Sequence, residues 1–292
     1  MSVFSPWYVL RPWRLAQRAA FEFGLIPRSV PAKVRLPFGA LIEVDPYRTI
    51  GRVLYATRTY DLAMAEVVFR LSCGQSLAVD VGANLGYVTL VMAAALSLDG
   101  RCHAFEPVPE IYRQLTRNCS TALNPQLAPR IVSHNLALSH KDGVSVISIP
   151  ADPNEGLASL NHIQGPCQMV DVRCARLDTC FGINQTIEVL KLDVEGHEFS
   201  VLEGAASLLG EGLIRHLIFE DHAGVKSPVM ALLHAYGFRI FLIVAGALGP
   251  RLIPHGDVTS LPAKSAPNWL ATQDFTDAAR RLKPLGWRVL GV

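Results

Sequence analysis

Apolar runs of strand length alternate with amphipathic segments along most of this chain. The apolar runs lie at about 77–81, 101–105, 131–137, 187–192, 214–219 and 238–244. Segments with helical spacing separate them, most clearly over about 86–97 and 108–118. Because strands that alternate with helices build parallel βαβ units, this pattern predicts an α/β fold with a doubly wound, mostly parallel sheet and helices on both faces.

Three features interrupt or extend the alternation. Val144–Ile149 follows an Asp-Gly turn and is predicted to be an extra strand. Polar, turn-rich residues 150–166 come next, before another apolar stretch at Met169–Val172. Near the C-terminus, a last strand at about Trp269–Ala271 is expected to close the sheet.

The two ends of the chain are set apart from the alternating region. Residues 1–60 are predicted to form an appendage, residues 61–272 the α/β domain and residues 273–292 a C-terminal tail. The appendage is expected to hold a helix over about 12–24 and a hairpin over 34–44. Because this helix carries arginine and tryptophan, peripheral contact with a membrane surface is one interpretation, and packing on its own domain or a partner subunit is the other.

The composition is typical of a globular chain with a large buried core, since 50% of its 292 residues are hydrophobic and 18% are charged. The formal net charge of +2 gives no electrostatic reason to expect a nucleic-acid partner. The 6 cysteines form no C-x-x-C pair, which favours a reducing, cytoplasmic location over a disulfide framework. No apolar run approaches the roughly 18 residues of a membrane-spanning helix.

Polar residues with a distinctive spacing follow the first two strands of the predicted sheet. The first strand ends in Asp80 and breaks into a turn that carries Gly82, Asn84 and Gly86, and the second strand ends before Glu106. In a doubly wound sheet, the carboxyl ends of these strands form a nucleoside pocket. Glycines let the backbone approach a ligand closely, and an acid after the second strand can accept both ribose hydroxyls. The sequence therefore predicts a nucleoside site.

The spacing of the turn distinguishes between possible nucleosides. A dinucleotide site has the pattern G-x-G-x-x-G, of which only two glycines can be matched here. Asp80 would repel a pyrophosphate, but it can orient an ammonium group directly or through water. S-adenosylmethionine has a ribose, an ammonium and no phosphate, so it fits better than NAD, and Asn135 after the third strand is a further candidate contact. An NAD-dependent oxidoreductase and a non-catalytic nucleoside-binding subunit remain the alternatives.

A second group of chemically active residues follows the fourth strand. Asp193 and Glu195 stand at its carboxyl end, at the topological switch point where ligands bind in such sheets. They can deprotonate a hydroxyl, orient a sugar or ligate a divalent cation, although no ligand spacing demands a metal. Lys191 is expected to pair with a carboxylate at this edge. Glu220 and His222, after the fifth strand, are candidates to line an acceptor pocket.

Five segments together resemble the FkbM family of S-adenosylmethionine-dependent methyltransferases, in order and spacing, over roughly residues 60–245. They are VDVGANLG at 79–86, AFEP at 104–107, NLALS at 135–139, RLD at 176–178 and KLDVEGHE at 191–198. The resemblance implies a Rossmann-like class I methyltransferase fold and methyl transfer to oxygen, on a small-molecule or glycan acceptor such as a sugar or a secondary metabolite. His197 stands where the family leads us to expect a small residue, so no catalytic role is carried over to it.

Overall fold

A computed structural model of the chain describes residues 19, 30–150, 167–221, 223, 227–259 and 267–291. The helix expected over 12–24 lies outside the described residues apart from Ala19, and so do His222 and nearly all of the polar stretch 150–166. None of the helices in the described part combines the length and the apolar character needed to cross a membrane.

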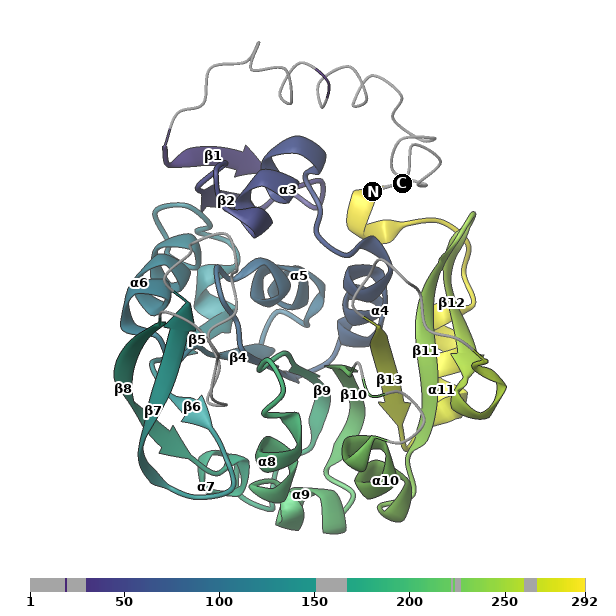
Figure 1. Cartoon of the computed structure of the whole chain (residues 1–292). Helices are drawn as coiled ribbons and strands as arrows, with labels where there is room; N and C mark the ends of the chain where they lie inside the picture. Colours follow the sequence, from purple (N-terminus) through teal and green to yellow (C-terminus); the bar gives the residue numbers. More distant parts are fainter. Residues whose placement is uncertain are drawn as a thin grey trace.

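An eight-stranded sheet forms the centre of the molecule (Figure 1). Its strands are β3 (Leu77–Val81), β4 (Arg101–Phe105), β5 (Ile131–His134), β9 (Ile187–Leu192), β10 (Ile214–Glu220), β11 (Arg239–Gly246), β12 (Gly249–Pro254) and β13 (Asn268–Thr272). They lie in the order β12-β11-β13-β10-β9-β3-β4-β5. From β5 to β10 all neighbours are parallel, whereas β13 and β12 pair antiparallel with their neighbours. The predicted doubly wound, mostly parallel sheet of the class I methyltransferase type is confirmed.

The far side of the sheet differs from the prediction. The strand expected near Trp269–Ala271 does not close the sheet, because β13 is inserted between β10 and β11. All five of its residues are buried, as an interior position requires. The edge strand is β12, which the sequence did not reveal. Gly249 and Pro250 begin it and Pro254 ends it, and these residue types disfavour strands except at edges.

The third strand is also shorter than the predicted 131–137. It ends at His134, and Ala137–Leu138 form β6 in a separate three-stranded sheet. The other strands of that sheet are β7 (Gly143–Pro150), which confirms the predicted extra strand, and β8 (Cys167–Ala175). Asn135 lies between the two sheets, and its side chain bonds to backbone groups beside β4, as described below.

Helices cover both faces of the central sheet (Figure 1). The helices in the described residues are α3 (Thr49–Thr57), α4 (Leu62–Ser72), α5 (Tyr87–Ala95), α6 (Pro109–Asn118), α7 (Leu177–Cys180), α8 (Glu198–Glu203), α9 (Ala206–Gly210), α10 (Pro228–Ala235) and α11 (Phe275–Leu282). One core packs α4 and α5 against the sheet, and another packs α8, α9 and α10 against the opposite face. Since side chains alternate along a strand, Ala78 faces the first core and Val79 the second, so Asp80 faces α4 and α5.

The hairpin predicted over 34–44 is confirmed as β1 (Ala32–Arg35) and β2 (Leu41–Val44). Asn124 and Asn118 anchor it, because their side-chain oxygens accept the N–H groups of β2 at Leu41 and Glu43, each at 2.8 Å. The amide of Asn118 also donates to the carbonyl of Leu85 at 2.8 Å. The hairpin is thereby tied to the turn that follows β3.

The C-terminal segment is held by a buried ion pair on α4. The side chains of Glu66 and Arg70 have no exposed surface, and Arg70 Nε lies 2.5 Å from Glu66 Oε1. The guanidinium donates to the carbonyl oxygens of Leu282, Pro284 and Gly286. The carboxylate accepts the backbone N–H groups of Arg288 and Val289. This one pair of side chains therefore supplies hydrogen-bond partners for backbone groups of the segment that follows α11.

Replacing Arg70 is expected to loosen this segment. Arg70→Met removes the donors to three carbonyls and leaves the Glu66 carboxylate buried without its cation, so the free energy of unfolding should fall by about 3–5 kcal/mol. Urea denaturation measures the loss. Arg35→Met, at an exposed position on β1, is the control and should change the same quantity by less than about 0.5 kcal/mol. Losses of similar size in the two variants would contradict this role.

Candidate functional site

The turn between β3 and α5 is held against the ends of two neighbouring strands. The N–H groups of Gly82 and Ala83 both donate to the carbonyl of Phe105 at the end of β4, at 3.0 and 2.9 Å. Gly82 has φ +77°, and a Cβ built on it would lie 1.8 Å from the carbonyl oxygen of Asp193. From the sequence we expect this glycine to admit a ligand. In the structure, the backbone carbonyl of Asp193, just after β9, is what leaves no room for a side chain at this position.

The last glycine of the turn has a similar packing reason. A Cβ on Gly86, which has φ +88° and precedes α5, would lie 2.8 Å from Cδ1 of Leu115 and 3.2 Å from Sγ of Cys119. Asn84 takes a left-handed φ of +48° without being glycine. Both glycines thus have a steric role in the fold, in addition to any contact with a ligand.

Glu106 is buried at the carboxyl end of β4. The residue is 5% exposed. Oε2 accepts the N–H of Asn84 and Oε1 accepts the N–H of Val108, both at 3.0 Å. Burial raises the pKa of this carboxyl to about 7. Because each carboxylate oxygen can accept a second hydrogen bond, Glu106 retains the capacity to accept two hydroxyl donors.

Asn135 supports the segment that carries Glu106. Its Nδ2 donates to the carbonyl of Glu106 at 2.9 Å and to that of Pro107 at 2.8 Å, while the N–H of Glu106 donates to the carbonyl of His134. The sequence predicted that Asn135 contacts the ligand directly. The structure adds a positioning role, because Asn135 holds the loop after β4.

Asp80 and Lys191 lie side by side on neighbouring strands. They are register partners on β3 and β9, and both residues are 1% exposed. Thr89 Oγ1 donates to Asp80 Oδ2 at 2.6 Å. Burial raises the pKa of Asp80 to about 6, against the opposing effects of the Thr89 hydrogen bond and the Lys191 charge. The Asp80 carboxylate is therefore enclosed beneath α5.

The loop after β9 carries the second group of candidate residues. Asp193 donates its N–H to the carbonyl of Val81 at 3.0 Å, and its Oδ2 lies 2.9 Å from Nζ of Lys191. This ion pair confirms the expectation that Lys191 pairs with a carboxylate. Glu195 and Gly196 follow with left-handed φ values of +52° and +88°. Burial raises the pKa of Glu195 to about 7, and the nearby charge of Asp193 adds to the effect.

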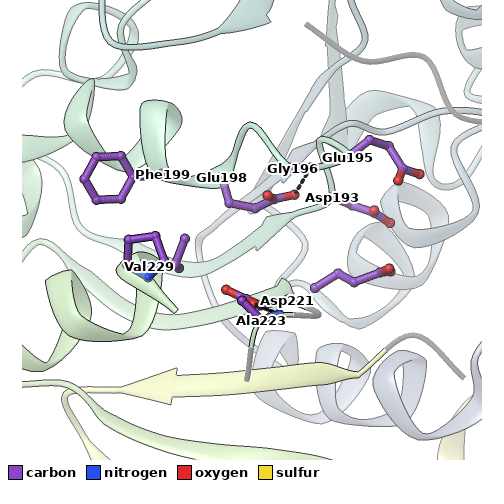
Figure 2. A pocket seen from close by; sticks show the side chains of 10 residues that line it. Asp193, Glu195, Gly196, Glu198, Phe199, Asp221, Ala223 and Val229 are labelled. Carbon is purple, nitrogen blue, oxygen red and sulfur yellow. Dashed lines mark hydrogen bonds between the residues drawn. The ribbon is translucent and has the colours of Figure 1, made fainter. Parts of the chain in front are cut away.

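A cavity of about 280 Å³ opens beside this loop, between the ends of β9 and β10 and the starts of α8 and α10. Its lining residues are Asp193, Glu195, Gly196, Glu198, Phe199, Glu220, Asp221, Ala223, Pro228 and Val229. Figure 2 shows the Asp193 and Glu195 side chains at one side of the cavity and those of Phe199 and Val229 at the other. The cavity thus offers both carboxylates and an apolar wall, and it includes the predicted Glu220.

The remaining side chains of this loop have structural partners. Glu198 Oε1 accepts the N–H groups of Val194 and Gly196 at 3.1 and 3.3 Å, which closes the turn before α8. His197 Nε2 lies 2.9 Å from Ser139 Oγ, and His197 does not line the cavity. Among the residues that the structure describes, no three His, Cys, Asp or Glu side chains are arranged to hold a metal ion.

The start of α4 brings two further residues that the sequence analysis missed. Asp61 accepts the N–H of Met64 at 3.1 Å and the amide of Asn268 at 2.8 Å. The pKa of Tyr60 is raised to about 12, first by burial and then by the charge of Asp193 and other carboxylates. An acid preceding a helical run is a visible capping signal, but the predicted domain boundary at 60/61 placed Tyr60 in the appendage and Asp61 at the first position of the α/β domain.

Comparison with known proteins finds related methyltransferases. Residues 80–240 match the model of the methyltransferase FkbM domain. Over 239 residues the chain is 26% identical to methyltransferase sdnD of Sordaria araneosa, which covers 70% of this chain and 87% of that protein. Over 194 residues it is 28% identical to hexuronic acid methyltransferase AglP of Haloferax volcanii, with coverages of 63% and 75%.

Solved structures show a more distant likeness. The chain is similar to a crystal structure of methyltransferase FkbM from Methylobacillus flagellatus KT, with a TM-score of 0.44 and 15% sequence identity. The likeness covers 68% of this chain and 44% of that one, so this chain spans less than half of its length.

The contact between Gly82 and Asp193 can be tested with a matched pair of glycines. Gly82→Ala should lower the free energy of unfolding by at least about 3 kcal/mol, because its Cβ meets a backbone carbonyl. Gly74 has a similar φ of +70° with no atom within 4 Å of a Cβ, so Gly74→Ala should lose only about 1–2 kcal/mol. Urea denaturation of the two variants compares them, and equal losses would show that the carbonyl contact is unimportant.

Proposed function

Because the chain belongs to the FkbM methyltransferase family and is a methyltransferase, we propose that it transfers the methyl group of S-adenosylmethionine to a hydroxyl oxygen of a sugar, glycan or secondary metabolite. The proposal rests on two groups of polar residues that lie next to each other at the carboxyl ends of the parallel strands. Glu106 lies on the β4 side of β3, and the cavity beside Asp193 and Glu195 lies on the β9 side. A donor and an acceptor bound there would meet near the end of β3.

The residues on the β4 side fit S-adenosylmethionine. Glu106 has one further acceptor position on each oxygen for the ribose hydroxyls, and Asn135 holds the loop that carries it. The enclosure of Asp80 favours an indirect, water-mediated contact with the ammonium group. When bound, S-adenosylmethionine supplies a methyl group that the positive sulfur has already activated.

The residues on the β9 side suit an acceptor with a hydroxyl group. Holding the acceptor oxygen in an attacking geometry is worth up to about 7–11 kcal/mol of the barrier. A side chain that takes the hydroxyl proton adds roughly a 10²–10⁴-fold acceleration. Asp193 and Glu195 both line the cavity and supply carboxylates for this step.

The charge of the cavity favours an uncharged acceptor over an acidic one. Its described lining includes five carboxyl side chains and no lysine or arginine. Two like charges about 4 Å apart repel by about 4 kcal/mol at an effective dielectric constant of 20. A hexuronic acid, which the relative AglP is named for, would therefore be disfavoured in this cavity.

The proposal is tested by methyl transfer from labelled S-adenosylmethionine to a panel of neutral sugars, polyols and uronic acids, with and without a chelator. We expect label in an alkali-stable ether on a neutral acceptor, without a metal requirement. Label in an alkali-labile methyl ester would contradict the hydroxyl assignment. Binding of S-adenosylhomocysteine without turnover on any acceptor would favour the alternative, a non-catalytic nucleoside-binding subunit.

Glu106→Gln is expected to weaken the binding of S-adenosylhomocysteine by about 1–3 kcal/mol, or roughly 5–150-fold, through loss of a charged acceptor. In the unaltered protein, affinity should rise with pH through about 7, because the ionised form accepts the ribose hydroxyls. The variant should lose this dependence. Calorimetry across pH measures both effects.

The matched control for this variant is Glu110→Gln, at an exposed position in the first turn of α6. It should leave both the affinity and its pH dependence unchanged. Thermal unfolding of Glu106→Gln separates loss of the ligand contact from disturbance of the turn. A folded variant with full affinity would remove Glu106 from the donor site.

Variants of the two acids beside the cavity should affect turnover more than donor affinity. Asp193→Asn and Glu195→Gln are each expected to lower kcat at least about tenfold, with less than about threefold change in the dissociation constant of S-adenosylhomocysteine. Glu203→Gln, at the exposed end of α8, serves as the control. Wild-type turnover in both acid variants would place the acceptor elsewhere.

A further inference from the structure

We propose that Lys191 is a positioning residue that holds Asp193 in an ion pair, and that Glu195 is therefore the side chain that takes the proton of the acceptor hydroxyl. This inference rests on the proposed function. It assigns different roles to Asp193 and Glu195, which the sequence alone does not distinguish.

The placement of Lys191 excludes direct contact with a substrate at the cavity. Its side chain is 1% exposed and lies between Asp80 on β3 and Ile218 on β10, its register partners. Nζ lies 2.9 Å from Asp193 Oδ2 and 3.4 Å from the carbonyl of Leu192. Asp193 is 35% exposed, so it connects the buried ammonium to the cavity.

Five carboxyl side chains interact electrostatically with Lys191. They are Asp80 on β3, Asp193 after β9, Glu195 in the next turn, Glu220 on β10 and Asp61 before α4. Burial lowers the pKa of Lys191, but the charge and hydrogen bond of Asp193, with Asp80 and Glu220, outweigh it and raise the pKa overall. Lys191 therefore stays protonated, and its ammonium forms an ion pair with Asp193 at 2.9 Å.

A carboxylate that is held in an ion pair is a poor proton acceptor, whereas Glu195 is suited to take the proton of the acceptor hydroxyl. The Glu195 turn has a left-handed φ at a residue other than glycine, a conformation that the fold maintains at some energetic expense. Burial, together with Asp193, Glu220 and Glu198, brings the pKa of Glu195 to about 7, whereas Lys191 opposes the shift. A base with a pKa near the operating pH is the most effective one.

The proposed step balances in atoms and charge. The acceptor oxygen forms a bond to the methyl carbon while its proton passes to the Glu195 carboxylate, which becomes a neutral carboxyl. The carbon–sulfur bond of the donor breaks, and its electron pair stays on sulfur as a neutral thioether. Glu195 then releases the proton to water. Asp193 stays paired with Lys191 throughout and orients the acceptor.

The pH dependence of kcat for methyl transfer to a neutral acceptor tests this division. We expect kcat of the unaltered enzyme to rise with pH through about 7. Glu195→Gln should abolish this rise and lower kcat at least about 100-fold. Asp193→Asn should keep the rise but move it to lower pH, because a carboxylate that repels ionised Glu195 is gone. Persistence of the rise in Glu195→Gln, or its loss in Asp193→Asn, would overturn the assignment.

Variants of Lys191 test the positioning role. Lys191→Met removes a positive charge and should move the rise in kcat to higher pH by about one unit, whereas Lys191→Arg should restore the original position. If Lys191→Met does not fold, Lys191→Met/Asp193→Asn removes the whole pair and should retain a rise that belongs to Glu195. An unshifted rise in folded Lys191→Met would show that the lysine has only a structural role.

A titration of the free protein gives a second readout without turnover. Glutamate carboxyl ¹³C NMR should show a resonance that titrates near pH 7 and is missing in Glu195→Gln. The same resonance should titrate higher in Lys191→Met. If the unaltered protein transfers no methyl group to a hydroxyl, the proposed function fails, but the Glu195 titration still tests the electrostatic part of this inference. Titration of Glu195 near pH 4.5 would contradict that part.

Discussion

The turn after β3 lies directly against the backbone after β9. Gly82 leaves no room for a side chain against the carbonyl of Asp193, and the N–H of Asp193 bonds in return to Val81. This double contact fixes the ends of β3 and β9 side by side. The turn that approaches Glu106 and the loop that carries Glu195 therefore form one edge, and the proposed transfer depends on that adjacency.

Charge is concentrated at the same edge. Burial raises the pKa values of Asp80, Glu106 and Glu195 to between about 6 and 7, from ordinary values near 4. When folding raises the pKa of a carboxyl, the free energy of unfolding falls as pH rises from the pKa of that group in the unfolded state to its pKa in the folded state. Near neutral pH the folded protein therefore carries an electrostatic cost at this edge. Donor hydroxyls, an acceptor proton and Lys191 are groups that can offset it.

The sequence predicted the part of the fold that periodicity determines. The strands at 77–81, 101–105 and 187–192 have the predicted bounds, because apolar runs bounded by turn residues are clear signals. The position of β13 was predicted wrongly, since strand order between distant segments depends on tertiary packing that local periodicity does not encode. The steric role of Gly82 was also missed, because its partner at Asp193 lies more than a hundred residues away. Tyr60 and Asp61 join the site for a similar reason, through the packing of α4 over β9.

Calorimetry of the unaltered protein with S-adenosylhomocysteine and with NAD tests the proposed nucleoside pocket at the ends of β3 and β4. A pocket that accepts a nucleoside with an ammonium-bearing chain and rejects a pyrophosphate should bind S-adenosylhomocysteine saturably. It should show no measurable binding of NAD. Preferential binding of NAD, or the absence of binding by S-adenosylhomocysteine to the folded protein, would contradict it.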